Sequence, residues 1–182
     1  MSEIMVDIET MAVSSKAVII TIGAIKFDRY GTDDNINNTD KFYSRIDMQS
    51  CVDIGLEVDP VTVNWWGKQP DIVSTEIYSP DDRNPIKSTL QRFTNWYTLG
   101  EEITHIWGHG SHFDIPILEN AYKACNLIPP WKFWQVRDTR TLYESTGVRI
   151  SNIYVKMKHH AMYDAFRQMI AVQKAFKKIQ NC

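Results

Sequence analysis

Apolar and polar positions along the first part of the chain follow the pattern of β-strands. Residues 4 to 9, IMVDIE, are an apolar-rich run typical of a buried strand. Residues 18 to 28, VIITIGAIKFD, are rich in β-branched residues and predict a second, longer strand. A polar turn, RYGTDDNINNTD, precedes residues 41 to 46, KFYSRI, which predict a third strand. Together these segments predict an antiparallel three-stranded meander.

Apolar residues at helical spacing become common after the meander. A short helix is expected over residues 60 to 68, and a longer one over residues 86 to 99, which Gly100 ends. Residues 104 to 110, THIWGHG, predict a strand followed by a turn.

The remainder of the chain predicts helices joined by an irregular aromatic connector. Asp114 precedes IPILENAYKAC, whose apolar residues recur at spacings of three and four, and the connector IPPWKFWQVRDT leads to a short helix, TRTLYES. A long helix is expected over about residues 161 to 178. This order of elements predicts one α/β domain over residues 1–182, with a mixed central sheet flanked by helices.

Composition argues against two classes of protein, the disordered and the membrane-spanning. Of the 182 residues, 43% are hydrophobic and 23% are charged, which are ordinary globular values, and no apolar run is long enough to span a bilayer. The first residues, MSEIMVDIET, show no export signal, so we expect a cytoplasmic protein. Cys51, Cys125 and Cys182 are widely spaced and predict reduced structural thiols.

Charge is distributed unevenly along the chain. Residues 1 to 60 hold eleven acidic and five basic side chains, a balance of -6, whereas residues 149 to 182 hold seven basic side chains and one acidic, a balance of +6. An acidic cluster opposite a basic segment would suit a metal site approached by a polyanion. A solvated face on a terminal helix explains the basic residues equally well.

Two carboxylates lie close together in the first predicted strand. Asp7 and Glu9 are two residues apart, so their side chains point to the same face of the sheet. They would repel each other there, and a divalent cation that prefers oxygen ligands would relieve the repulsion. The alternative is that both side chains reach solvent at the end of the strand.

Two further aspartates lie at the start of predicted helices. Asp114 can cap the helix that follows it, and Asp164 lies in the first turn of the long helix, where the helix dipole favours an acid. Asp114 also follows a strand and a glycine-bearing turn, where open α/β sheets place ligand-binding residues. Each acid has a structural explanation, but the ordered set of four, with a histidine before the last, points to a metal-dependent site.

Three motifs in this order resemble those of the DEDD exonucleases of the ribonuclease H-like superfamily. VDIETM matches the first motif with Asp7 and Glu9, HFDIPIL matches the second with Asp114, and HHAMYDA matches the third with His159 and Asp164. IWGHGSHFD and PWKFWQVRDTRTL look like the phage and prophage branch that includes DexA and exonuclease VIII-like proteins. The resemblance covers essentially the whole chain. Because a histidine lies five residues before the last aspartate, the chain resembles the DEDDh subclass.

The resemblance implies a metal-dependent 3′-to-5′ exonuclease with a ribonuclease H-like fold. It implies that His159 is the general base of phosphodiester hydrolysis and that four carboxylates hold two Mg²⁺ or Mn²⁺ ions, namely Asp7, Glu9, Asp114 and Asp164. The implied substrate is the 3′ end of single-stranded DNA or RNA, and the implied products are nucleoside 5′-monophosphates. If the chain is phage-encoded, the expected location is the host cytoplasm.

Residues beside the motifs are candidates for substrate contacts. In the family, the segment after the first motif lies against the terminal nucleotide, which implies roles for Thr10 and Met11, and Phe113 is the aromatic residue beside the second-motif aspartate. Apolar and aromatic side chains stack on bases of any sequence. Core packing is an equal alternative for Met11 and Phe113, while Trp65 and Trp66 are expected in the core or an interface more than on substrate.

The adjacent histidines His159 and His160 differ in their spacing to Asp164. In a continuous helix His160 would share a face with Asp164, four residues on, and would resemble a second metal ligand. The resemblance instead implies that His159 is the base. The two views agree if the helix begins near Ala161 and leaves His159 on an approach loop, so we expect His160 to face solvent.

The alternative function is a ribonuclease H-like module that binds nucleic acid or a host factor without catalysis. Such a module would be expected to lack one of the acids or the histidine, and all are present. DNA and RNA are both candidate substrates because the family contains both specificities. A homodimer is a further expectation, since related small exonucleases often dimerise and six tryptophans offer interface anchors.

Overall fold

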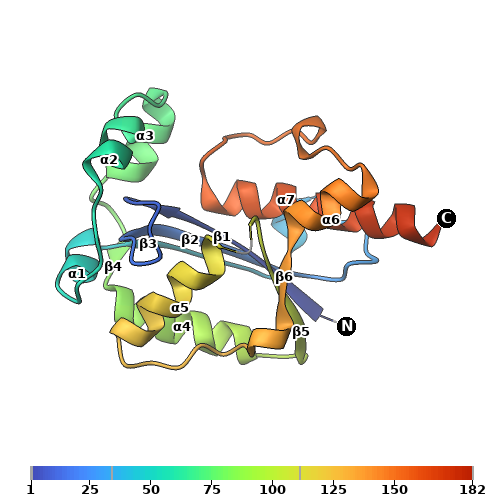
Figure 1. The fold of residues 1–182 in the computed structure, drawn as a ribbon, viewed down its shortest axis with the longest axis horizontal. Coiled ribbons are helices and arrows are strands. Elements are labelled where there is room, and N and C mark those ends of the chain that lie inside the picture. Colours follow the sequence, from blue (N-terminus) through green and yellow to red (C-terminus); the bar gives the residue numbers. More distant parts are fainter. Residues whose placement is uncertain (1, 34, 111, 182) are drawn as a thin grey trace.

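The computed structural model describes residues 2–33, 35–110 and 112–181, which form one mixed sheet with helices on both faces (Figure 1). The strand order is β4-β3-β2-β1-β5-β6. β2 is antiparallel to both β1 and β3, whereas β5 is parallel to β1 and β6 is parallel to β5. The predicted fold, an antiparallel meander extended by parallel strands and flanked by helices, is confirmed.

The first three strands precede the first α-helix, and the other three lie among the α-helices. The strands are β1 (Ser2–Thr10), β2 (Ile19–Phe27), β3 (Lys41–Ile46), β4 (Arg83–Asn84), β5 (Ile103–Gly108) and β6 (Val136–Asp138). The α-helices are α1 (Met48–Val52), α2 (Pro60–Trp66), α3 (Asp71–Tyr78), α4 (Ile86–Thr98), α5 (Asp114–Ala124), α6 (Thr139–Thr146) and α7 (Ala161–Gln180). Short 3-10 helices are η1 (Ile36–Asn38), η2 (Phe133–Gln135) and η3 (Ile150–Asn152).

Successive side chains of β1 point to opposite faces of the sheet. Ile4, Val6 and Ile8 are buried in the core that α4 and α5 complete, while Met5 is buried in the core formed with α7. Because side chains alternate along a strand, the acids Asp7 and Glu9 lie on the same face as Met5. The end of β1 therefore directs its carboxylates toward α7, the helix that carries the last motif.

The first turn of α7 lies directly on β2 at Gly23. Gly23 is paired in register with Asp7, and a Cβ added to it would come within 2.6 Å of backbone atoms of Ala161 and Met162. No side chain fits in that space, so the strand needs glycine for the close approach of the helix backbone. Gly23 thereby allows Asp164, in the same turn of α7, to lie next to Asp7.

Four elements depart from the sequence predictions. α1 and α3 lie where no element was predicted, and β4 and β6 lie in stretches predicted to be a loop and an irregular connector. β4 and β6 are only two and three residues long, too short to show a period, and they are strands because they pair with β3 and β5. The long helix begins at Ala161 as predicted and continues past the expected residue 178.

Two of the three cysteines lie in the described part of the chain. Cys51 and Cys125 are buried and free, as predicted for structural thiols, and Cys182 lies outside the described residues. Burial raises the pKa of the Cys51 thiol to about 12, which keeps it protonated. None of the helices described is both long and apolar enough to cross a membrane.

Candidate metal centre and active site

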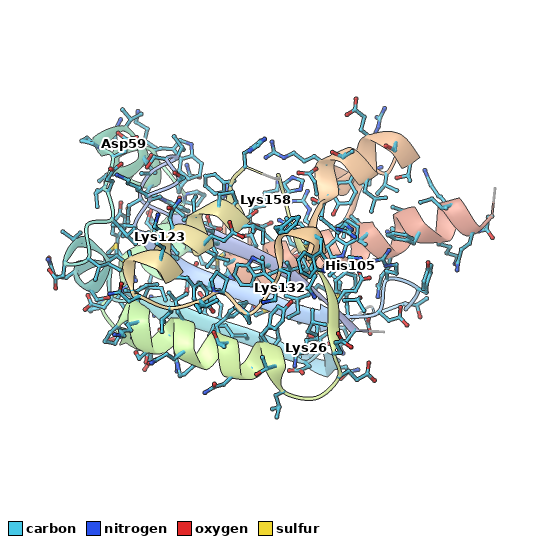
Figure 2. All side chains as sticks on the ribbon, turned by 60° about the horizontal axis from the view of Figure 1, so that its bottom comes forward. Lys26, Asp59, His105, Lys123, Lys132 and Lys158 are labelled. Carbon is cyan, nitrogen blue, oxygen red and sulfur yellow. The ribbon has the colours of Figure 1, made fainter. Side chains whose placement is uncertain are left out.

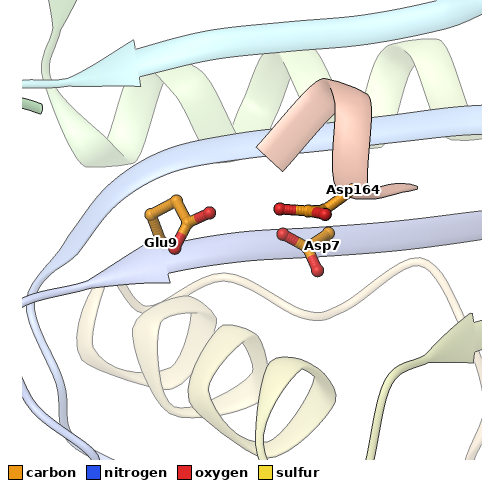
Figure 3. Close-up of side chains that lie close together, drawn as sticks. All are labelled: Asp7, Glu9 and Asp164. Atoms are coloured by element: carbon orange, nitrogen blue, oxygen red, sulfur yellow. The ribbon is translucent and has the colours of Figure 1, made fainter. Parts of the chain in front are cut away.

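Three carboxylates from two elements meet at the end of β1. Asp7 and Glu9 project from β1 and Asp164 from the first turn of α7, and one oxygen of each lies within 4.8 Å of the others (Figure 3). Gln168 Nε2 donates to Asp7 Oδ1 at 2.6 Å, and the backbone N–H of His159 donates to Asp164 Oδ2 at 2.7 Å. The structure thus brings together three of the four acids singled out in the sequence.

A cavity of about 310 Å³ lies over these carboxylates. Its lining residues are Asp7, Ile8, Glu9, His109, Phe113, Asp114, Arg140, Ile150, His159, Asp164, Arg167 and Gln168. The cavity therefore combines clustered carboxylates, two guanidinium groups and the imidazole of the expected base.

Asp114, the fourth acid, lines the same cavity but is not in the group of three. It is only 2% exposed, its Oδ1 accepts the N–H of Ile8 at 3.2 Å, and its Oδ2 accepts the N–H of His109 at 2.9 Å. Phe113 occupies the capping position of α5, so Asp114 is the first helical residue and not the cap. Each of its oxygens keeps a second lone pair, so Asp114 can still face a cation.

Burial raises the pKa values of Asp7, Glu9 and Asp114. Burial is the largest cause for Asp7 and Glu9, whose pKa values the neighbouring carboxylates raise further. Burial raises the pKa of Asp114 to about 6, against the stabilising backbone N–H groups of His109 and Ile8. Half-buried carboxylates this close repel one another unless a cation joins them, and a donor set made of carboxylate oxygens suits Mg²⁺ or Mn²⁺. The residues present fit a divalent cation.

We expect the acid cluster to destabilise the metal-free protein as pH rises. A carboxyl group whose pKa is raised on folding binds more protons in the folded state, so the free energy of unfolding falls as pH rises above the unfolded pKa of about 4. In chelator, the stability advantage of Asp7→Asn over wild type should therefore grow from about pH 4 to about pH 8. Urea denaturation of both proteins at each pH measures this difference in the free energy of unfolding. All other ionisable groups are common to the two proteins and largely cancel, so an advantage that does not change with pH contradicts this expectation.

His159 lies between the acid cluster and two tryptophans of α2. Its backbone is left-handed, with φ of 58°, a conformation that residues other than glycine rarely adopt. Its ring meets Trp65 edge-on, with 5.0 Å between centroids, and Trp66 at 6.3 Å. Trp66 is anchored in turn, because its Nε1 donates to the carbonyl oxygen of Thr10 at 2.9 Å. The imidazole is thus held at the cavity wall and is not one of the three clustered ligands.

His160 does not face solvent, contrary to the sequence expectation. Its Nδ1 accepts the N–H of Met162 at 3.3 Å and caps α7, and its ring stacks on Tyr43 with 4.9 Å between centroids. Burial lowers the pKa of His160. Two contacts account for this: a helix that begins at Ala161 places His160 in the capping position, and the ring of Tyr43, on a distant strand, holds the imidazole inward by stacking.

A second, apolar pocket of about 390 Å³ adjoins the acid cavity. Its lining residues are Glu9, Thr10, Val13, Val61, Thr62, Trp65, Trp66 and Phe113. Glu9 and Phe113 line both spaces, so a molecule in the apolar pocket can extend to the carboxylates. Trp65 is 42% exposed and forms a wall of this pocket, whereas Trp66 is buried as expected.

The expected substrate residues have different surroundings. Thr10 and Phe113 line the apolar pocket, although the Thr10 hydroxyl already donates to the carbonyl oxygen of Ala12 at 2.7 Å. Met11 is 3% exposed and belongs to the core below the sheet, so the core-packing alternative describes its side chain. Met11 follows the last residue of β1, and its N–H bonds the Val18 carbonyl, which turns the side chain inward.

Four lining residues escaped the sequence reasoning: Arg140, Ile150, Arg167 and Gln168. Arg167 and Gln168 follow Asp164 by three and four positions, so helical periodicity alone would have placed them on its face. Arg140 and Ile150 come from α6 and η3, and no local pattern predicts that these elements reach the site.

Comparisons with known proteins find similar nucleases. A family model described as the 3′-5′ exoribonuclease Rv2179c-like domain matches residues 2–176. The exodeoxyribonuclease of Enterobacteria phage T4 is 26% identical over 167 residues, which cover 80% of this chain and 72% of the relative.

Solved nuclease structures share the fold. Cell-death related nuclease 4 (CRN-4) has a TM-score of 0.59 at 14% identity, over 97% of this chain and 64% of CRN-4, so this chain spans less than two thirds of that protein. The nuclease domain of 3′hExo, a DEDDh family member bound to rAMP, has a TM-score of 0.59 at 13% identity, over 97% and 92% of the two chains. Pop2p of S. pombe, in a form with Mg²⁺ and Mn²⁺, has a TM-score of 0.54 at 12% identity, over 98% and 82%.

Proposed function

Because the chain belongs to the Rv2179c-like 3′-5′ exoribonuclease domain family, we propose that its acid cavity removes nucleotides one at a time from the 3′ end of single-stranded nucleic acid. The protein is a 3′-5′ exonuclease, and the sequence resemblance to the DEDDh exonucleases is confirmed. The observation that carries the proposal is the meeting of Asp7, Glu9 and Asp164 in a cavity that His159 also lines. Residues 1–182 act as one domain in this proposal.

Divalent metal dependence follows from the donor set. Asp7, Glu9 and Asp164 would hold two Mg²⁺ or Mn²⁺ ions, with Asp114 behind them as a further carboxylate facing the same cavity. Bound there, the ions would supply Lewis-acid stabilisation of the charge that develops during phosphodiester hydrolysis.

His159 accepts the proton of the attacking water in this proposal. His109 also lines the cavity, but its Nδ1 is hydrogen-bonded to the Thr139 hydroxyl at 2.8 Å. General bases such as His159 contribute about 10²- to 10⁴-fold to a rate. The backbone N–H of His159 donates to Asp164 and its ring packs against Trp65 and Trp66, so the imidazole is held beside the clustered carboxylates without being one of the clustered ligands. The proton then leaves to solvent.

Two arginines of the cavity orient the scissile phosphate. A guanidinium group matches the geometry of phosphate oxygens and forms paired hydrogen bonds with them. Arg167 is held in place because its Nε donates to the Ile150 carbonyl oxygen at 3.1 Å, and its Nη1 lies 3.8 Å from Asp164 Oδ1. Arg140 lines the cavity from α6. Together they place the phosphate between the carboxylates and His159.

The apolar pocket receives the base of the terminal nucleotide. It joins the acid cavity through Glu9 and Phe113, and its aromatic walls accept any base by stacking. Thr10 contributes its backbone and Phe113 its ring, as expected for substrate contacts, whereas the Met11 side chain lies behind them in the core. Stacking does not distinguish the hydrogen-bonding edges of the bases, so such a pocket suits an enzyme that digests strands of any sequence.

We expect Trp65→Ala to weaken substrate binding and to slow turnover together. Loss of the aromatic wall should raise KM about tenfold, since stacking contributes about 1 to 3 kcal/mol per base. Loss of the edge contact with His159 should lower kcat as well. Trp65→Phe should retain most of both, and Trp134→Ala, which removes an exposed tryptophan outside the pocket, serves as control. Equal kinetics for Trp65→Ala and Trp134→Ala contradict this assignment.

An end-label digestion tests the proposed function. Single-stranded DNA and RNA carrying a label at the 5′ or the 3′ end are incubated with Mg²⁺, Mn²⁺ or EDTA. We expect the 3′ label to leave first as a nucleoside 5′-monophosphate, the 5′ label to persist on shortening strands, and EDTA to stop both. Internal fragments would indicate an endonuclease, and intact strands in every arm would indicate the non-catalytic binding module. Either outcome rejects the proposal, and the DNA and RNA arms identify the preferred sugar.

A further inference from the structure

A third cavity, distinct from the acid cavity and the apolar pocket, is lined by basic side chains. Its volume is about 700 Å³, and its lining residues are Gly147, Val148, Arg149, Asn152, Ile153, Lys174, Lys177, Lys178 and Asn181. Four of these residues are basic and none is acidic. We call this cavity the basic groove; it lies between the C-terminal half of α7 and the segment that follows α6.

The charges of the basic groove are not neutralised by carboxylates. Arg149, Lys174 and Lys177 are exposed, and no ion pair among the described residues includes them. Lys178 Nζ donates to the carbonyl oxygens of Thr146 and Gly147 at 3.1 and 3.4 Å, which fixes the ammonium group without cancelling its charge. A concave surface with one sign of charge concentrates ions of the opposite sign.

The basic groove and the acid cavity are lined by neighbouring residues of one short segment. Ile150, the first residue of η3, lines the acid cavity, while Arg149 and Asn152 on either side of it line the basic groove. The segment after α6 folds back along α7 toward its first turn (Figure 1). A nucleic-acid strand that leaves the acid cavity therefore has only the segment around Ile150 to cross before it reaches the basic groove.

Helical geometry aligns the two sites along α7. Arg167, Lys174 and Lys178 are seven and four residues apart, so they lie on one face of the helix. At a rise of about 1.5 Å per residue, Lys174 lies about 15 Å beyond Asp164 and Lys178 about 21 Å beyond it. One side of α7 thus presents a carboxylate and an arginine at the reaction site, followed by a row of cations leading away from it.

We propose that the basic groove binds the sugar-phosphate backbone of the substrate several nucleotides upstream of the 3′ end that is being hydrolysed. This inference rests on the proposed function, because that function makes the substrate a polyanion that extends out of the acid cavity. Contacts of Lys and Arg with phosphates do not depend on base sequence, and they release counterions, which makes binding sensitive to salt. The groove holds the strand while the end is trimmed.

Two double charge-reversal variants test the groove by their affinity for a single strand, without relying on catalysis. Lys174→Glu combined with Lys177→Glu changes two exposed side chains of the groove, and Lys123→Glu combined with Lys132→Glu makes the same change in net charge at two exposed lysines outside it (Figure 2). Fluorescence anisotropy with a labelled single strand of about twenty nucleotides is recorded in EDTA over a range of salt concentrations. Thermal denaturation confirms that both variants are folded.

The groove variant is expected to bind the strand about tenfold more weakly than the control variant. Its plot of log affinity against log salt should be shallower by about 1.4, because two phosphate contacts on a single strand contribute about 0.7 each. Equal affinity and equal slope for the two variants overturn the proposal. The end-label digestion separates the two failures: strand shortening by wild type with equal binding rejects the groove alone, whereas absence of shortening rejects the proposed function and leaves the binding comparison valid.

Discussion

Asp7→Asn is expected to lower exonuclease activity by about three orders of magnitude while it stabilises the metal-free protein. The variant removes one charge from three carboxylates within 4.8 Å, so it weakens the site for divalent ions, which supply several kcal/mol of charge stabilisation in hydrolysis. In EDTA the same change removes repulsion at a half-buried carboxylate whose pKa is raised by burial and by the neighbouring acids, which should increase the free energy of unfolding at neutral pH. The amide oxygen can still accept the Gln168 hydrogen bond.

Initial rates with Mg²⁺ and urea denaturation in EDTA measure the two effects of Asp7→Asn. Asp82→Asn is the matched control, because Asp82 is exposed and its left-handed backbone, with φ of 56°, suits Asn equally well. The control should leave both quantities within error of wild type. Loss of activity accompanied by loss of stability in EDTA would mean that Asp7 supports the fold and not a metal site.

His159→Ala is expected to lower kcat by about 10²- to 10⁴-fold and to leave the stabilisation by added Mg²⁺ nearly intact. The ring is at the cavity wall, while Asp164 receives its hydrogen bond from the backbone N–H of residue 159, which alanine retains. Turnover is measured with excess strand, and metal binding by the rise in melting temperature on adding Mg²⁺.

The neighbouring histidine supplies the control for His159→Ala. His160→Ser keeps a side-chain acceptor for the N–H of Met162, so α7 stays capped while the imidazole is removed. We expect His160→Ser to retain turnover within a few-fold of wild type. The assignment of the base fails if His160→Ser loses turnover as severely as His159→Ala, or if His159→Ala also abolishes the stabilisation by Mg²⁺.

The parts of the site that sequence could predict are those set by local periodicity. Alternation along β1 places Asp7 and Glu9 on one face, and the start of α7 at Ala161 separates His159 from Asp164. The same periodicity would have identified Arg167 and Gln168, four residues or fewer beyond Asp164. These features depend on neighbours in the chain, so a single sequence contains them.

The parts that escaped prediction depend on contacts between distant segments. His160 faces inward because Tyr43, on β3, offers its ring for stacking, and Trp66 reaches the site because its indole bonds the carbonyl of Thr10. η3 carries too few residues for a pattern, although its first residue, Ile150, completes the cavity wall. Gly23 could be predicted only in part. A glycine within a strand indicates that another backbone packs closely against it, but the sequence does not say that this backbone is the first turn of α7.

Crystals grown with Mn²⁺ and a nucleoside 5′-monophosphate test the central claim most directly, because anomalous scattering locates the ions without assuming a mechanism. We expect two anomalous peaks bounded by Asp7, Glu9 and Asp164, with the nucleotide phosphate between them and His159 and the base beside Trp65. Peaks at another site, a metal ion bound by His160, or no peak in the acid cavity at saturating Mn²⁺ would contradict the assignment of this cavity as the metal-dependent active site.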